Sequence, residues 1–227
     1  MAIVIGIPVY PGTNCDFDVY KAIKLAGAIP KRIWYKDYEE IKKVDAVVIP
    51  GGFSYADYIR AGAIAARTKM TEIIKELGAN GMPILGICNG FQILVESGIL
   101  PGALAVNKNA RFICRWVHLK VLRIDTPFTQ LYAEGEIIKM PIAHMEGRYV
   151  PGEGFSDDLI VLQYSDRKGN VNDESNPNGS YKNIAGIVNR EGNIMGLMPH
   201  PERASERILG GNDGLRMFKA LIDYLKR

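Results

Sequence analysis

Short apolar runs alternate with helix-like segments over the first hundred residues, and this alternation restricts the fold more than any other feature. Runs at residues 2–7, 29–35, 45–50 and 83–87 predict strands. Because they are nearly continuously apolar, the strands should be covered on both faces, as in a parallel sheet. The sequence therefore predicts a doubly wound α/β core.

Helices are expected between these strands. Asn14 is a candidate cap for a first helix that Gly27 would end. One or two helices are expected in residues 57–77, another from residue 89 to about residue 97, and a last one over residues 213–226. The apolar side chains of the first helix that should face the core are Phe17, Tyr20, Ile23 and Leu25.

From Arg111 the pattern changes to strands without intervening helices. Apolar runs at residues 112–124, 136–144, 159–164, 184–189 and 194–198 predict an antiparallel extension of the same sheet or a small second sheet. Residues 166–182 are rich in Asn, Ser and Gly, which predicts a long exposed hairpin loop. No linker or repeat divides the chain, so residues 1–227 are expected to form a single domain.

Composition excludes several classes of function. The 28 Lys and Arg residues against 25 Asp and Glu leave a net charge of +3, without the concentrated basic stripe that nucleic-acid binding requires. No signal peptide and no run of about 18 apolar residues is present, which argues against a membrane span. Cys15, Cys88 and Cys114 fit neither a disulfide framework nor a paired metal motif, so we expect a cytoplasmic protein without a metal.

The segment PILGICNGFQ at residues 83–92 places a cysteine between a predicted strand and a predicted helix. Gly86 and Gly90 flank Cys88 in the G-x-C-x-G frame of a nucleophile elbow, where small residues permit a sharp turn that exposes the side chain. The sulfur would then lie at a helix N-terminus, where the helix dipole favours a thiolate. The alternative is a buried structural cysteine.

A cysteine nucleophile requires a base, and His200 is the best placed of the three histidines. Pro201 favours an extended conformation for His200, so that Glu202 should lie on the same side of the chain. Glu202 could then orient the imidazole ring as the third member of a triad. The alternative is a histidine and a carboxylate paired at the surface.

Consecutive glycines follow the third predicted strand, in IPGGFS at residues 49–54. At the carboxyl end of a parallel strand they allow backbone N–H groups to point into the ligand-binding crevice. The N–H of Gly52 or of Phe53, together with that of Asn89, could form an oxyanion hole. The alternative is an ordinary Gly-Gly turn. No dinucleotide or ATP fingerprint occurs in the chain.

These motifs, in this order, resemble the class I (triad) glutamine amidotransferases, and specifically those that serve as glutaminase subunits of phosphoribosylformylglycinamidine synthases. The resemblance extends over essentially the whole chain. It departs from the family pattern at Ala56 and Met145, where the family usually has glycine. The segments that carry it are YPGTNCD (10–16), PGGFSYAD (50–57), GICNGFQ (86–92), PIAHMEGRY (141–149), NPNGS (176–180) and NIAGIVNREGNIMGLMPHPER (183–203).

The resemblance implies a flavodoxin-like sheet and a role for each motif residue. Cys88 would attack the carboxamide of glutamine, His200 would transfer protons and Glu202 would orient His200. Gly51, Gln92 and His144 would contribute to glutamine binding, although helix packing for Gln92 and a structural role for His144 remain equal alternatives.

The resemblance also implies partners. The chain would hold no cofactor of its own and would pass ammonia to a separate synthetase subunit that uses ATP and Mg²⁺, with a small third subunit in the same complex. Alternatives are an amidotransferase subunit that serves another acceptor, a non-enzymatic binding subunit in which Cys88 is silent, and a stand-alone cysteine hydrolase.

Overall fold

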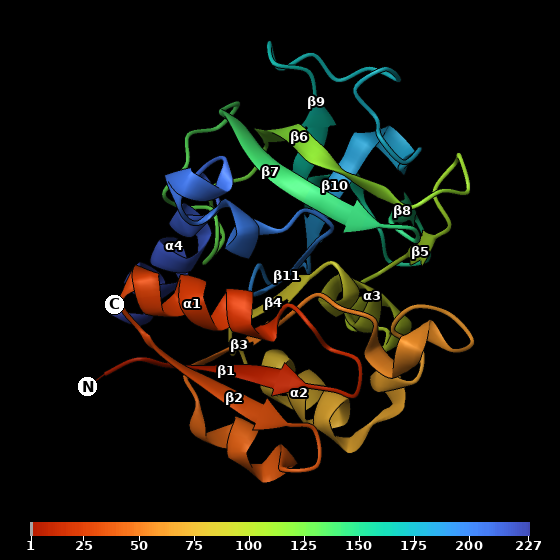
Figure 1. Ribbon diagram of the computed structural model, residues 1–227. Helices are drawn as coiled ribbons and strands as arrows, with labels where there is room; N and C mark the ends of the chain where they lie inside the picture. Colours follow the sequence, from red (N-terminus) through yellow and green to blue (C-terminus); the bar gives the residue numbers. More distant parts are fainter. Residues whose placement is uncertain (1) are drawn as a thin grey trace.

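Nine strands form one mixed sheet in the computed structural model, which describes residues 2–227 (Figure 1). The order is β2-β1-β3-β4-β11-β10-β9-β6-β7, parallel from β2 to β11 and antiparallel from β11 onward. The doubly wound core and its antiparallel extension are therefore confirmed. The strands are β1 Val4–Val9, β2 Ile29–Trp34, β3 Ala46–Ile49, β4 Ile84–Ile87, β6 Ile113–Val121, β7 Ile137–His144, β9 Ile160–Ser165, β10 Ile184–Val188 and β11 Ile194–Leu197.

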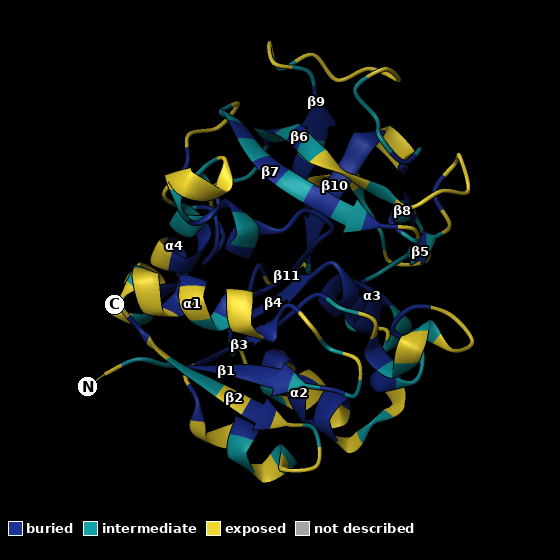
Figure 2. Cartoon of the chain, in the orientation of Figure 1, coloured by how far each residue is buried: buried dark blue, intermediate teal, exposed yellow. Residues whose placement is uncertain are grey.

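Four α-helices cover the parallel half. Helices α1 (Asp16–Ala26) and α4 (Leu215–Leu225) pack against each other, and α2 (Lys69–Ala79) and α3 (Asn89–Glu96) lie on the opposite face (Figure 1). Strands β5 (Ala103–Ala105) and β8 (Arg148–Val150) form a separate two-stranded sheet. One buried apolar cluster runs through the molecule, and the strands of the parallel half lie at its centre (Figure 2). Within residues 2–227, none of the helices combines the length and apolar character needed to cross a membrane.

The first helix differs in detail from the prediction. Gly27 ends it in a left-handed conformation as expected, but the residue at its N-cap is Cys15 and not Asn14. The Asn14 amide oxygen accepts a hydrogen bond from the Cys15 thiol (3.3 Å) and so does not cap the helix. Phe17 and Leu25 are exposed (64% and 44%) and do not face the core as predicted. The Arg32 guanidinium lies over the Phe17 ring at the surface (3.8 Å to the ring centroid).

Residues 57–77 contain one α-helix, in agreement with the one or two helices expected, but residues 57–68 are not part of it. Only α2, Lys69–Ala79, is an α-helix there, and short 3-10 turns and loops precede it. The Tyr55 N–H donates to the Pro11 carbonyl (2.6 Å), which ties this segment to the loop after β1. Ala56 has a φ of 54°, a left-handed conformation that favours glycine.

The segment 166–182 connects β9 and β10 as a hairpin loop, as expected, but it is not exposed throughout. Asn178 and Ser180 are buried. The Asn178 amide donates a hydrogen bond to the Gly147 carbonyl (2.7 Å), and the Ser180 hydroxyl accepts one from the Tyr149 N–H (3.0 Å). Polar side chains are buried here because they satisfy backbone groups of the 141–149 motif.

Close packing at the β4–α3 turn gives the first testable prediction. A Cβ atom on Gly90 would lie 2.2 Å from the Ile49 carbonyl oxygen, and backbone cannot move aside as a side chain can. We expect Gly90→Ala to lower the free energy of unfolding by more than about 2 kcal/mol, measured by chemical denaturation. Gly211→Ala is the control, since its Cβ would contact only the Trp116 side chain, at 3.3 Å. Equal stability of the two variants would contradict this packing.

Candidate active site

Cys88 lies in the turn between β4 and α3, in the strained backbone conformation of a nucleophile elbow. Its φ and ψ are 50° and −104°, and its N–H donates to the Leu197 carbonyl of β11 (2.8 Å). A Cβ on Gly86 would lie 2.8 Å from the Gly90 backbone, so both flanking glycines are required for the turn. The structure thus builds the predicted elbow, with the sulfur at the N-terminus of α3.

His200 and Glu202 follow β11 and are almost completely buried, with exposed fractions of 2% and 1%. His200 has the extended conformation that Pro201 favours, and its N–H donates to the Pro141 carbonyl of β7 (2.8 Å). Residues Pro201–Ala204 form a 3-10 turn, which carries the Glu202 carboxylate back to the ring. The Nδ1–Oε1 distance is 2.6 Å, so the predicted pairing of the two side chains is confirmed, although through a turn and not an extended chain.

The surroundings of His200 favour its charged form. Burial opposes an imidazolium, but the Glu202 carboxylate and negative charge on the Cys88 sulfur together outweigh it and raise the pKa of His200 well above its usual value. Among residues 2–227, His200 Nε2 has no hydrogen-bond partner, and the Cys88 thiol donates to the Ala143 carbonyl (3.7 Å). The free imidazole nitrogen is available to a reacting molecule.

Gly51 lets these side chains converge. A Cβ at this position would lie 2.8 Å from His200 Cε1, 3.1 Å from Cys15 Sγ and 3.5 Å from Cys88 Cβ. Gly51, which was predicted as a site residue, therefore leaves the space in which the His200 imidazole and two cysteine side chains approach one another.

Sequence reasoning missed Cys15 as part of the site. Its thiol is buried, and donor atoms of Cys15, His200 and Glu202 all lie within 4.8 Å of one another, a spacing that could suit a metal ion. The Arg203 guanidinium, however, donates to Cys15 Sγ (3.1 Å), and a cation at that place opposes a second one. The position of Cys15 could have indicated its role: it follows β1, and the carboxyl ends of parallel strands meet at the edge of the sheet where ligands bind.

The two candidate oxyanion donors at the third strand are not equivalent. The Phe53 N–H already donates to the Gly12 carbonyl (3.0 Å) and is therefore not free to bind an oxyanion in this structure. Gly52 has a φ of 147°, a conformation that favours glycine, and a Cβ there would lie 2.8 Å from Asn14 N. Asn89 is the first residue of α3, where N–H groups lack intrahelical partners. Gly52 and Asn89 remain the candidate donors.

Gln92 and His144 are held by the protein itself. The Gln92 amide donates to the Glu146 carbonyl (2.7 Å) and accepts from the Asn89 side chain (2.9 Å), which ties the 141–149 motif to α3. His144 Nδ1 lies 3.2 Å from Asn107 Oδ1. Burial and then the nearby charge of His200 lower the pKa of His144 to about 3, so its ring is neutral near pH 7. These contacts hold both side chains beside the site, but His144 Nε2 is buried without a hydrogen-bond partner among residues 2–227. A contribution of either residue to glutamine binding stays a prediction.

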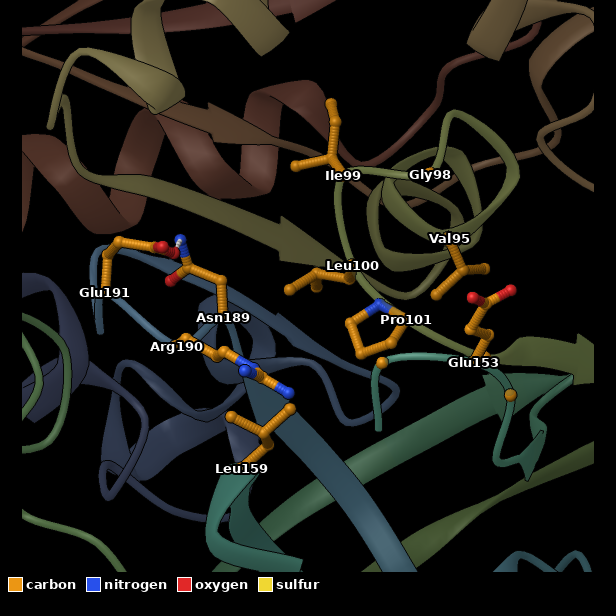
Figure 3. A pocket seen from close by; sticks show the side chains of 13 residues that line it. Val95, Gly98, Ile99, Leu100, Pro101, Glu153, Leu159, Asn189, Arg190 and Glu191 are labelled. Carbon is orange, nitrogen blue, oxygen red and sulfur yellow. Dashed lines mark hydrogen bonds between the residues drawn. The ribbon is translucent and has the colours of Figure 1, made fainter. Parts of the chain in front are cut away.

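A cavity of about 480 Å³ lies beside the C-terminal end of α3 (Figure 3). Cys88 is at the N-terminal end of the same helix. Val95, Leu100 and Pro101 form its apolar part, and Arg190 and Glu153 its charged part. None of the residues that surround Cys88 lines this cavity. Cavity size therefore does not locate the candidate active site, which is identified by its chemistry.

Comparisons with known proteins identify the family of the chain. The CobB/CobQ-like glutamine amidotransferase domain matches residues 3–225. The chain is 60% identical, over 96% of its length and 97% of the relative's, to the phosphoribosylformylglycinamidine synthase subunit PurQ of Pyrococcus horikoshii. It is 53% identical to the subunit of the same name from Methanosarcina barkeri, over 97% of both chains.

Solved structures show the same fold. A chain in the structure of PurLQS from Thermotoga maritima is 45% identical, with a TM-score of 0.90 over 99% of this chain and 100% of that one. A glutamine amidotransferase from the same organism is 14% identical, with a TM-score of 0.60 over 99% of this chain and 98% of that one, and supports the fold alone.

The contact distances at Gly51 give the second prediction. In Gly51→Ala the new methyl group must displace the His200 ring, so we expect iodoacetamide to alkylate Cys88 at least several-fold more slowly at pH 7, as measured by peptide mass spectrometry. The unfolding temperature shows whether the fold survives. Gly211→Ala, whose Cβ would contact only the Trp116 side chain, should be alkylated like the unsubstituted chain. An unchanged rate in Gly51→Ala would contradict the convergence of these side chains.

Proposed function

The chain belongs to the CobB/CobQ-like glutamine amidotransferase family, and from this premise we propose that it is the glutaminase subunit of a phosphoribosylformylglycinamidine synthase. The observation that carries the catalytic part of the proposal is the buried Cys88, His200 and Glu202 constellation at the end of β4 and β11. Identity of 60% to a PurQ subunit over nearly the full length supports the specific complex.

The proposed reaction begins when the Cys88 sulfur attacks the carboxamide carbon of glutamine. His200 gives its proton to the amide nitrogen, the C–N bond breaks and ammonia leaves, which forms a glutamyl thioester and a neutral imidazole. Water then attacks the thioester, and its proton passes to His200. The C–S bond breaks, glutamate leaves, and the imidazolium and the thiolate of Cys88 are restored.

Glu202 and the backbone donors lower the barriers of these steps. The Glu202 carboxylate fixes Nδ1 as the protonated nitrogen, so that Nε2 is the atom that exchanges protons with the substrate. The Gly52 and Asn89 N–H groups would stabilise the oxyanion of each tetrahedral intermediate by about 3 kcal/mol per donor.

The ammonia is proposed to pass to a separate synthetase subunit, which converts formylglycinamide ribonucleotide to its amidine with ATP and Mg²⁺. The neighbour from Thermotoga maritima belongs to a structure of PurLQS, which supports an assembly of several subunits. We propose that a small third subunit belongs to this assembly. We propose that this chain binds no cofactor and acts in the cytoplasm, where its three free thiols, Cys15, Cys88 and Cys114, would stay reduced.

Replacing the proposed nucleophile gives the third prediction. In the complex reconstituted with the synthetase and small subunits, Cys88→Ser should reduce glutamine-dependent synthesis by at least about 10³-fold, because a hydroxyl is a far weaker nucleophile in this setting. Synthesis supported by added ammonium should continue at the unsubstituted rate. Cys114→Ser, at an exposed free thiol, is the matched control. Glutamine-dependent synthesis by Cys88→Ser would show that another residue is the nucleophile.

A further inference from the structure

A second buried thiol faces the catalytic histidine, and the proposed reaction makes no use of it. Cys15 is 2% exposed and lies at the N-terminus of α1, just as Cys88 lies at the N-terminus of α3. Its sulfur is across Gly51 from Cys88, and its donor atom is within 4.8 Å of those of His200 and Glu202. The position is not that of a core cysteine surrounded by apolar groups.

The other side of the Cys15 sulfur contacts a cation. Arg203 Nη2 donates to Sγ at 3.1 Å, and the Asn14 amide oxygen lies 3.3 Å from the same sulfur. Arg203 Nε lies 3.6 Å from the Asp18 carboxylate of α1 and 4.0 Å from Glu202 Oε1. Arg203 thus belongs to the network of charges around the triad, and within the site it contacts both Cys15 and Glu202.

We infer that Cys15 and Arg203 are positioning residues that set how strongly His200 holds its proton during glutamine hydrolysis. The inference rests on the proposed function, because it assigns these residues to the same reaction. It requires no covalent step at Cys15, whose sulfur accepts a hydrogen bond from Arg203 and faces His200.

The sign of each contribution follows from Coulomb's law. A sulfur that carries partial negative charge beside His200 stabilises the imidazolium, whereas the guanidinium of Arg203 destabilises it. The contact with Cys15 is among those that raise the pKa of His200. His200 must be protonated to release ammonia and neutral to activate water, so its proton affinity has to be balanced and not merely high.

The charged and titratable groups named around His200 all enter this balance. Cys88 and Glu202 favour the imidazolium, and Cys15 adds to them from the loop between β1 and α1. His144 of β7 is neutral near pH 7 and contributes little. Arg203 is the opposing cation, and Asp18 partly neutralises it.

The experiment compares pH profiles of kcat and kcat/KM for glutamine in the reconstituted complex. Because the active form holds a protonated His200, activity is lost on the alkaline side as the imidazolium deprotonates. We expect Cys15→Ala to shift the alkaline limb to lower pH by roughly half to one unit, which is the effect of removing one hydrogen-bonding contact. Arg203→Met removes an opposing cation and should shift the same limb to higher pH.

Cys15→Ser keeps a group that can accept from Arg203 and should restore most of the unsubstituted profile. The KM for glutamine should stay within about twofold in all three variants, because the substituted atoms act through His200. Synthesis with added ammonium, which bypasses His200, should be unchanged and reports that each complex is folded and assembled.

The inference is overturned if Cys15→Ala and Arg203→Met leave the alkaline limb in place, or move it in the same direction, while ammonium-dependent synthesis persists. An unsubstituted complex that makes product from ammonium but not from glutamine would instead overturn the proposed function. The two failures are therefore distinguishable in one set of assays.

Discussion

The hydrogen bond between His200 and Glu202 is the interaction on which the rest of the site depends. A carboxylate that is 1% exposed is costly unless a positive group or hydrogen-bond donors compensate it. Here the compensation comes from the His200 ring, whose Nδ1 lies 2.6 Å from Oε1 and whose charged form is favoured by both Glu202 and Cys88. The three groups are therefore electrostatically interdependent, and removing any one leaves the others buried without their partner.

The sheet supplies the geometry that this interaction needs. Cys88 and His200 follow two adjacent parallel strands, β4 and β11, so their backbones end at the same edge. Strand β7 of the antiparallel half also contributes to this edge. Its Pro141 carbonyl accepts a hydrogen bond from the His200 N–H, and its Ala143 carbonyl accepts one from the Cys88 thiol. The antiparallel extension thus holds the triad in place, and Gly51 leaves the space in which it meets.

Much of this arrangement could be predicted from the sequence. Continuous apolar runs predicted the parallel strands, and the glycines around Cys88 predicted the elbow, because both depend on local chain properties. What could not be predicted depends on contacts between distant segments. The Phe53 N–H donates to the Gly12 carbonyl, and Asn178 is buried against the 141–149 motif. Cys15 lies near His200 because β1 and β3 are neighbours in the sheet. Periodicity and spacing carry no information on such pairings.

The most direct test of the account is the identity of the covalent intermediate. The complex is mixed with glutamine, quenched in acid within milliseconds, digested and analysed by mass spectrometry for a glutamyl group on cysteine. The account predicts the adduct on the peptide that contains Cys88 and its absence from the peptides that contain Cys15 and Cys114. A glutamyl group on Cys15, or release of ammonia without any cysteine adduct under conditions that slow hydrolysis of the thioester, would contradict it.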